Sequence, residues 1–285
     1  MKRLAALTLA LVCLAPALGL AQETVEADFE SGRWLYEDAA QGVRIEITRH
    51  EDTENRVLWY EADLRFGEES PLRFLTANEE SPGKGFWYPE RLAREKRAVF
   101  AINDDQFGHR VYNHDTVGVI VRGGEVLSER TRKSGSKGWP PLDTAAFFPD
   151  GSMRVFESAE HTGEEYLAMG AENVLAFGPW LVRGGEINPA LETAYRTKEP
   201  RTAIGQCADG SVLLLVLDGR SINTLGATMQ DVADIMLEYG AVNAGNLDGG
   251  SSSVMVYDGE IINNCASVTG PRNIPTAFIV LPEGD

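Results

Sequence analysis

Five turn motifs of similar kind recur along this chain, and they restrict its fold more than any other feature. Three combine apolar residues with Gly-Gly or Asp-Gly, Glu and a β-branched residue: IVRGGEV (120–126), LVRGGEI (181–187) and VYDGEI (256–261). Two others, FFPDGSMRVF (147–156) and GQCADGSVLLLVLDG (205–219), contain Asp-Gly-Ser. Such pairs favour the tight turns of β-hairpins. Turn chemistry explains the recurrence better than a repeated binding motif does.

The rest of the chain predicts strands with few helices. Helices are expected at 87–96, where Pro89 suits the first turn, and at 228–240, where Thr228 and Asp231 have capping-box spacing. No solenoid period or linker is visible. We therefore predict an α+β fold, mostly mixed or antiparallel β-sheet with hairpins, in a single compact domain. Further strands are expected at 43–47, 56–66, 98–103, 213–220 and 241–247, and surface loops at 135–141 and 188–200.

The first 21 residues have the pattern of a secretory signal peptide. Lys2 and Arg3 precede an apolar run, and Gly19-Leu20-Ala21 is a small-x-small cleavage site. A retained membrane anchor is the alternative, but the run is short for a span. We expect cleavage near Ala21, one domain over 22–285, no membrane span after cleavage, and a periplasmic or secreted protein.

The charge of the chain is strongly negative. The net charge is −17, and loss of Lys2 and Arg3 with the signal peptide makes it −19. This charge opposes binding to nucleic acid or to an anionic membrane. An anionic substrate would need a local cluster of arginines.

Metal and cysteine chemistry is weakly indicated. No Cys/His spacing suggests zinc, and four histidines are too few and scattered to argue a metal. We expect no cofactor; an acid-rich site is compatible with Ca²⁺, but no spacing demands it. Cys207 and Cys265 remain after cleavage, and in an oxidising compartment they form either a disulfide or two free thiols.

Ionisable and amide side chains follow or precede the predicted strands. Because a buried strand holds its terminal side chains rigidly, we expect these residues to form the functional site. Each arginine taken alone is also explained as a solvated surface residue. The candidates are Asn103, Asp104, Asp105, Arg201, Asp218, Arg220, Asn246, Asp248 and Arg272.

The Asp248–Ser252 stretch has two readings. It is an ordinary tight turn, or it is an anion-binding nest built from the N–H groups and hydroxyls of Gly249, Gly250, Ser251 and Ser252. It is not a Walker loop, because the Gly-Lys-Ser/Thr ending is absent.

Paired carboxylates also suit glycosyl transfer, which generally needs two acids. Asp218 and Asp248 are the main pair and Asp105 is a third candidate, although an Asp before Gly is also a normal turn residue. No G-x-S-x-G elbow supports a nucleophilic serine.

Six ordered segments resemble the phosphodiester glycosidase family over about residues 86–283. They are AINDDQFG, AFGPWLVRGGEI, PRTAIG, LVLDGRS, AVNAGNLDGGSSSVMVYDGEIINN and GPRNIPTAFIV. The family includes the lysosomal uncovering enzyme, which removes N-acetylglucosamine from phosphodiester-capped mannose. Many bacterial relatives are exported and labelled as exopolysaccharide-related.

The resemblance implies roles for individual residues. Pro200–Gly205 matches in full, so Arg201 is an expected phosphate ligand; Asp218, Gly219 and Arg220 match Asp-Gly-Arg. Asn246–Ser252 matches except that Ser251 replaces a third glycine. Asn103, Asp105 and Phe107 match, whereas Asp104 and Gln106 depart from the pattern, and Arg272 lies in an imperfect match.

The resemblance thus predicts an exported hydrolase that cleaves a GlcNAc-1-phosphodiester-like bond in a glycan or envelope polysaccharide. Arg201 and Arg272 would hold the phosphodiester, with help from residues 249–252. Asp248 or Asp218 would be the nucleophile or general base, and Asn103, Asp105 and Asn246 would bind sugar hydroxyls. The alternatives are a non-catalytic envelope or exopolysaccharide-binding protein, and a hydrolase of ordinary glycosides.

Overall fold

The computed structural model describes residues 23–67, 73–76, 88–103, 105, 117–130, 142–266, 271 and 276–280. Arg272, Asp104 and the predicted signal peptide lie outside these residues. The described part of the chain forms three β-sheets and three α-helices. Among the described residues, no helix has the length and apolar character needed to cross a bilayer.

The largest sheet has nine strands and positions most of the candidate residues. Its order is β1-β2-β3-β4-β15-β14-β16-β12-β13. In that order the strands are Glu23–Asp28, Arg33–Asp38, Val43–Asp52, Val57–Arg65, Val212–Leu217, Arg201–Cys207, Ala241–Asn246, Trp180–Arg183 and Glu186–Ile187.

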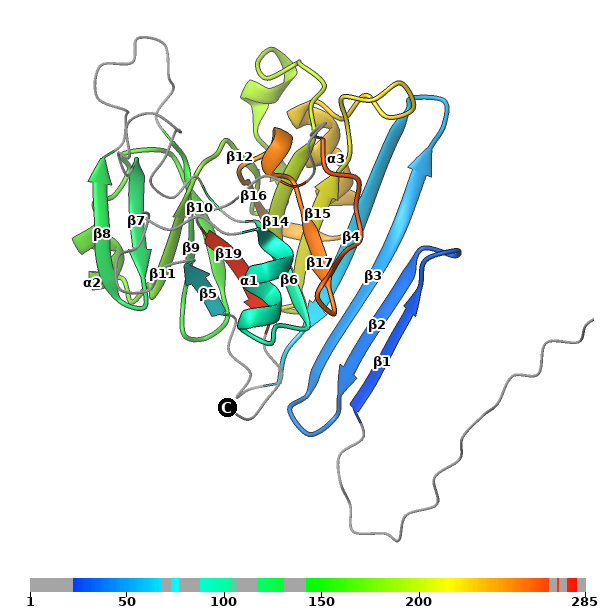
Figure 1. Cartoon of the computed structure of the whole chain (residues 1–285). Coiled ribbons are helices and arrows are strands. Elements are labelled where there is room, and N and C mark those ends of the chain that lie inside the picture. Colours follow the sequence, from blue (N-terminus) through cyan, green and yellow to red (C-terminus); the bar gives the residue numbers. More distant parts are fainter. Residues whose placement is uncertain are drawn as a thin grey trace, which may run out of the picture.

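Two five-stranded sheets complete the fold. One has the order β10-β9-β11-β7-β8, with strands Met153–Phe156, Thr144–Phe147, Asn173–Ala176, Gly118–Arg122 and Glu125–Arg130. The other has the order β18-β17-β6-β19-β5, with strands Glu260–Ile261, Met255–Tyr257, Phe100–Asn103, Thr276–Val280 and Arg73–Thr76. In Figure 1, β7 and β8 lie on one side of the molecule and β1–β4 on the other, with β6, β17 and β19 between them.

The helices are short and their ends are well defined. They are α1 (Pro89–Glu95), α2 (Gly163–Ala168) and α3 (Met229–Glu238), and two 3₁₀ turns, η1 (Pro189–Glu192) and η2 (Gly250–Ser252), accompany them. Helix α3 begins with a capping box between Thr228 and Asp231. Its apolar side packs on β12, β14 and β16 through Val232, Ala233 and Met236, which covers one face of the nine-stranded sheet.

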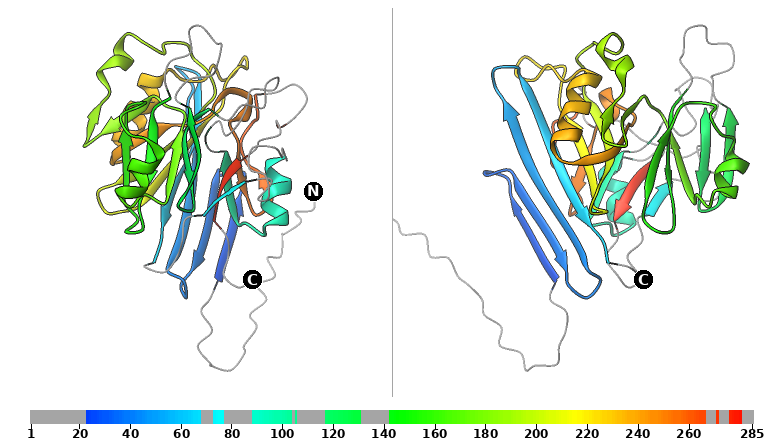
Figure 2. Two further views of the ribbon diagram at one scale, coloured as in Figure 1. Left: turned by 90° about the vertical axis from the view of Figure 1, so that its left-hand side faces the viewer. Right: turned by 180° about the vertical axis from the view of Figure 1, so that it is seen from behind.

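One apolar core joins all three sheets. Along β3, Val43, Ile45 and Ile47 are buried while the residues between them are not, as expected for a half-buried strand. These side chains belong to one cluster with Phe147 of the second sheet and Phe100 of the third. Figure 2 shows the arrangement of the strands and helices from two further directions. A shared core of this kind makes the described residues one compact domain.

All five predicted hairpins are confirmed: β7–β8, β12–β13, β17–β18, β9–β10 and β14–β15. In the β12–β13 turn, both Gly184 and Gly185 have positive φ (61° and 81°), as a type I′ turn requires. The helices expected at 87–96 and 228–240 are α1 and α3.

The prediction of a mostly antiparallel fold is also confirmed, although the helical content is small. The expectation of mixed pairing is corrected, because every pairing between strands of the described residues is antiparallel.

Candidate active site at one end of the nine-stranded sheet

Strand register brings three distant segments to the same end of the nine-stranded sheet. Arg201 at the start of β14 pairs with Leu217, the residue before Asp218, at the end of β15. Strand β16 ends at Asn246 opposite Ala203. The chain then continues beside β14, since Leu247 N donates to Thr202 O (2.8 Å) and Gly250 N donates to Pro200 O (2.9 Å). Segments about 201, 218 and 248 therefore meet.

The two glycines after Asp248 allow this close approach. A Cβ on Gly249 would lie 2.8 Å from the carbonyl oxygen of Pro200. Gly250 has φ of +65°, and a Cβ there would lie 3.1 Å from Nη2 of Arg220. Larger residues at either position would push the Pro200 strand or the Arg220 guanidinium away. The turn is thus built around its neighbours, and Ser252 in it is buried.

Asp248 is half-buried at the end of β16, and its backbone is held by Asn103. The Asn103 Nδ2 donates to Asp248 O at 2.6 Å. The Asn103 Oδ1 accepts from Thr202 Oγ1 and from Val254 N, both at 3.0 Å. Asn103 is buried and most of its hydrogen-bonding capacity is used inside the protein. These contacts fix the Asp248 loop.

Asp218 is enclosed, with a relative exposure of 1 %. Its Oδ1 accepts from Asn263 Nδ2 and Asn264 N, both at 3.1 Å, and its Oδ2 accepts from Asn264 Nδ2 at 3.0 Å. Burial raises the pKa of Asp218 to about 6, because the charged form loses hydration, while these hydrogen bonds oppose the rise. The carboxylate anchors the 263–264 segment to β15.

Part of the Arg201 guanidinium donates hydrogen bonds to backbone carbonyl oxygens. Its Nε donates to Ala227 O at 3.0 Å and its Nη2 donates to Thr197 O at 2.7 Å. Burial lowers the pKa of Arg201, nearby Arg220 lowers it further, and Glu199 opposes both effects. A guanidinium has five N–H donors, so about three remain for a ligand.

Arg220 is the more exposed cation of the two. Its backbone has φ of +57°. Its Nε donates to Glu199 Oε2 at 2.6 Å, and its Nη1 donates to Ser251 Oγ at 3.3 Å. Ser251 Oγ donates in turn to Ala266 O at 3.3 Å. Ser251, which replaces a glycine of the family pattern, thus adds a hydroxyl that contacts Arg220.

Asn246 is the last residue of β16, at this end of the sheet, and it is buried. Its Nδ2 donates to Gly178 O at 2.8 Å, next to the cis peptide bond between Gly178 and Pro179. Its Oδ1 has no hydrogen-bond partner within the described part of the chain. A cavity of about 10 Å³ beside Asn246 and Trp180 is about the size of one water molecule.

Asp105, predicted as a catalytic or sugar-binding residue, is buried in the described structure. Its side chain is 0 % exposed and pairs with Arg122 Nη2 at 2.7 Å. Its Oδ2 also accepts from Ala176 N at 2.8 Å. Burial raises the pKa of Asp105, and the attraction of Arg122 opposes this rise. The pair joins the segment after β6 to the β7–β11 sheet.

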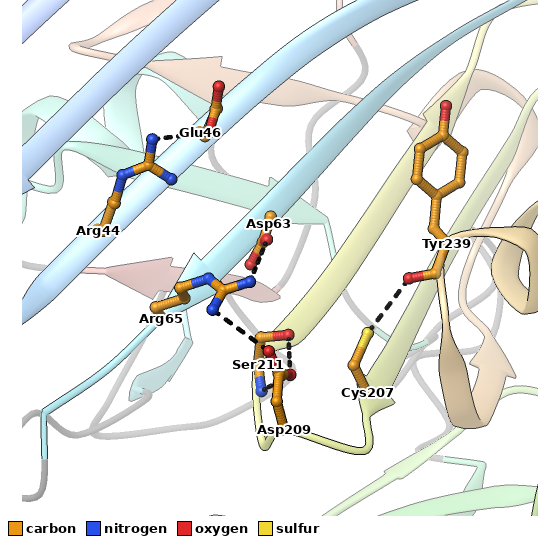
Figure 3. A network of polar contacts seen from close by, with 8 residues as sticks. All are labelled: Arg44, Glu46, Asp63, Arg65, Cys207, Asp209, Ser211 and Tyr239. Carbon is orange, nitrogen blue, oxygen red and sulfur yellow. Dashed lines mark hydrogen bonds and ion pairs between the residues drawn. The ribbon is translucent and has the colours of Figure 1, made fainter.

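The two cysteines are free, so a disulfide between Cys207 and Cys265 is not formed. Cys207 ends β14 six residues beyond Arg201, which is about 20 Å along a strand. Cys265, in contrast, follows Asn264 at the Asp218 end. The Cys207 Sγ donates instead to Tyr239 O at 3.5 Å (Figure 3).

A larger cavity, of about 840 Å³, lies at this opposite end of the sheet. Cys207, Asp209 and Asp150 help to line it, but none of the candidate catalytic residues does. Beside it, Arg65 bridges Asp63 (3.1 Å) and Asp209 (3.2 Å), as Figure 3 shows. Within the described ranges, no group of His, Cys, Asp or Glu is arranged to hold a metal ion.

Three residues of the site were missed by sequence reasoning. Glu199, Asn263 and Asn264 carry the contacts to Arg220 and Asp218. Glu199 stands in a loop where an acidic residue is ordinary. The Asn263-Asn264 pair belongs to the longest segment of the family resemblance. Beyond that, the only sequence feature that could have drawn attention to it is the presence of two amide side chains directly after a predicted hairpin.

Two arginines and a carboxylate at a glycine-lined strand end define a class of site suited to anionic substrates. The chain belongs to the phosphodiester glycosidase family, whose model matches residues 96–281. That range contains every segment of the site described above.

Individual relatives agree with this family. The chain is 33 % identical over 197 residues to the SPbeta prophage-derived uncharacterized protein YomE of Bacillus subtilis, covering 68 % of this chain and 30 % of YomE. It is 31 % identical over 159 residues to human N-acetylglucosamine-1-phosphodiester alpha-N-acetylglucosaminidase, covering 48 % of this chain and 29 % of the enzyme. The chain thus spans less than a third of the length of these relatives.

Solved structures share the fold. The catalytic domain of zebrafish N-acetylglucosamine-1-phosphodiester alpha-N-acetylglucosaminidase, auto-inhibited by its pro-peptide, matches with a TM-score of 0.68 and 19 % identity. The match covers 93 % of this chain and 89 % of that domain. A putative exported protein of Burkholderia pseudomallei matches with a TM-score of 0.57 and 14 % identity over 79 % of this chain and 74 % of that chain.

Proposed function

We propose that this protein is a hydrolase that cleaves the bond between a sugar and a phosphodiester. The observation that carries the proposal is that the chain segments bearing Asp248, Arg201 and Arg220 converge at one end of the nine-stranded sheet. Membership of the phosphodiester glycosidase family supports it. The names of the human and bovine relatives favour an N-acetylglucosamine-1-phosphodiester as substrate.

Asp248 is the proposed catalytic carboxylate. It is half-buried, whereas Asp218 is enclosed by Asn263 and Asn264 and Asp105 by Arg122. A carboxylate at the anomeric carbon acts as a nucleophile or activates water. Phosphate is a fairly good leaving group, so the reaction needs little help from a second acid. Asp218 instead positions the 263–264 segment beside the site.

Arg201, Arg220 and the turn of residues 249–252 bind the phosphodiester. The remaining N–H groups of Arg201 and Arg220 suit phosphate oxygens, because charge-assisted hydrogen bonds to oxyanions are strong. The backbone and hydroxyls of residues 249–252 lie beside Arg220. Arg272, outside the described residues, remains a proposed third ligand. Asn246, with its unpartnered Oδ1, remains the proposed sugar-binding amide.

The natural setting of the reaction is proposed from the N-terminal sequence. A signal peptide over residues 1–21 would deliver the protein to the periplasm or the medium, where envelope glycans and exopolysaccharides carry phosphodiester-linked sugars. A non-catalytic glycan-binding protein would keep the same arginines but turn nothing over.

Substitution of Asp248 tests the proposal. Asp248→Asn should abolish release of GlcNAc from a chromogenic GlcNAc-α-phosphodiester, because the amide can neither attack nor deprotonate water. Asp234→Asn, on the exposed side of α3, is the matched control and should keep full activity. Circular dichroism checks that both variants fold. Full activity in Asp248→Asn would refute the assignment, and inactive wild-type protein that still binds the sugar phosphate would favour the binding-protein alternative.

A further inference from the structure

The Arg220 guanidinium is held on three sides. Glu199 Oε2 accepts from its Nε at 2.6 Å, and Ser251 Oγ accepts from its Nη1 at 3.3 Å. The third side is Gly250. The position that a Cβ would occupy on this glycine is 3.1 Å from Nη2, 3.4 Å from Nη1 and 3.4 Å from Cζ. These distances mean that the end of the guanidinium lies close to Gly250.

The backbone that carries Arg220 is also fixed. The adjacent turn closes through Ser221 N to Thr224 O (2.9 Å) and Thr224 N to Ser221 Oγ (2.9 Å). On the other side, a Cβ on Gly219 would lie 2.9 Å from both Gly226 Cα and Pro200 N, so these chain segments touch. Arg220 therefore projects from a tight junction and not from a free loop.

Glu199 is anchored independently of Arg220. Its backbone forms an isolated bridge with Ala227, through Glu199 N to Ala227 O (3.2 Å) and Ala227 N to Glu199 O (3.0 Å). Gly226 packs so closely that a Cβ there would lie 2.4 Å from the Glu199 carbonyl group. The backbone of Glu199 is consequently a fixed point from which its side chain reaches Arg220.

Glu199 also interacts electrostatically with both Arg201 and Arg220. Arg220 lowers the pKa of Arg201 and Glu199 raises it, which means that all three charges interact. Two guanidinium groups near each other repel, and a carboxylate that interacts with both offsets that repulsion. The same carboxylate would, by its charge alone, repel an anionic ligand.

We propose that Glu199 is a positioning residue that holds the Arg220 guanidinium beside Gly250, so that its remaining N–H groups face the phosphate of the substrate. This inference rests on the proposed function, because it assigns the anion recognised at that site. It makes Arg220 a specificity-determining residue for the phosphodiester and gives Glu199 no contact with the reacting atoms.

Whether Glu199→Ala weakens or tightens anion binding distinguishes a positioning role of Glu199 from a purely electrostatic one. If Glu199 acted only through its charge, Glu199→Ala would tighten the binding of an anion. If Glu199 positions Arg220, the same change should weaken the binding of GlcNAc-1-phosphate by about tenfold, the scale of a lost charge-assisted hydrogen bond. Glu199→Gln keeps an acceptor for Nε and should recover part of the affinity. Glu192→Ala, in the exposed η1 turn, is the control and should bind as the wild type does.

The experiment is calorimetric titration of GlcNAc-1-phosphate into wild type, Glu199→Ala, Glu199→Gln, Glu192→Ala, Arg220→Ala and the double variant Glu199→Ala/Arg220→Ala. We expect the double variant to bind no more weakly than Arg220→Ala, because Glu199 acts through Arg220. With the chromogenic substrate, KM should rise more than kcat falls. Unchanged or tighter binding in Glu199→Ala, or additive losses in the double variant, would overturn the inference. Wild-type binding without turnover would instead count against the proposed function alone.

Discussion

Asp218 and Asp248 look alike in sequence, since each follows an apolar strand and precedes glycine. Their environments separate them. Asp218 is enclosed by two asparagine side chains and a backbone N–H, whereas Asp248 is half-buried beside the glycine turn. The sequence could predict the pair. It could not predict which one is accessible, because the residues that enclose Asp218 come from a segment about 45 positions later.

The raised pKa of Asp218 predicts a pH dependence of stability. The unfolded carboxyl ionises near 3.8 and the native one near 6. Between these values the native state binds more protons, so the contribution to stability is present below pH 3.8 and is lost as the pH rises to about 6. The loss should amount to roughly 1–3 kcal/mol.

This effect is measured by thermal unfolding of the wild type and of Asp218→Asn at pH values from about 3.5 to about 7, a range that includes the pKa of Asp218 in the unfolded and the native state. The variant cannot titrate at this position, so its curve should fall less steeply from pH 4 to 6. It should also be less stable overall, because an amide nitrogen would face the donors of Asn263 and Asn264. Parallel curves for the two proteins would contradict the assigned pKa.

At the scale of elements, helix α3 does more than cover the sheet. Thr228 Oγ1 accepts from Asp231 N at 3.1 Å, and Thr228 N donates to Asp231 Oδ2 at 2.8 Å. The preceding residue, Ala227, accepts from Arg201 Nε and bridges Glu199. The start of α3 therefore holds the backbone against which Arg201 and Glu199 are fixed.

The two capping boxes found in the described part of the chain provide a matched test of this link. Thr228→Ala and Thr162→Ala should each cost about 1 kcal/mol of stability, because each removes the hydroxyl that caps a helix. Thr162 begins α2, which packs on β7 and β8. Only Thr228→Ala should also raise KM for the sugar phosphodiester. Thermal melts and steady-state kinetics check both effects, and equal changes of KM in the two variants would refute the link.

Local elements were largely predictable from the sequence. Paired glycines and Asp-Gly turns located all five hairpins, because their chemistry acts over a few residues. Strands β1, β2, β5 and β11 and helix α2 were not foreseen. β1 is mostly exposed and lacks an apolar face, and α2 has only six residues, so neither gives a strong periodic signal.

At the scale of the whole molecule, the site exists because of strand order. β15 pairs with β4 and β14, and β14 also pairs with β16, which places three distant strand ends side by side. Hairpin signals predict the β14–β15 pair. They do not predict β4 beside β15 or β16 beside β14, because these pairings depend on how the core fills and not on a local turn. For the same reason, the sequence could not place Cys207 and Cys265 at opposite ends of the sheet.

The central claim is that the protein breaks the bond between the sugar carbon and the phosphate oxygen. Hydrolysis of a GlcNAc-α-phosphodiester in ¹⁸O-labelled water tests it most directly, with the released phosphomonoester analysed by mass spectrometry. Attack at the anomeric carbon leaves the phosphate group without ¹⁸O, since water adds to the sugar. We predict an unlabelled phosphomonoester. A phosphate that carries ¹⁸O would mean attack at phosphorus and would contradict the account.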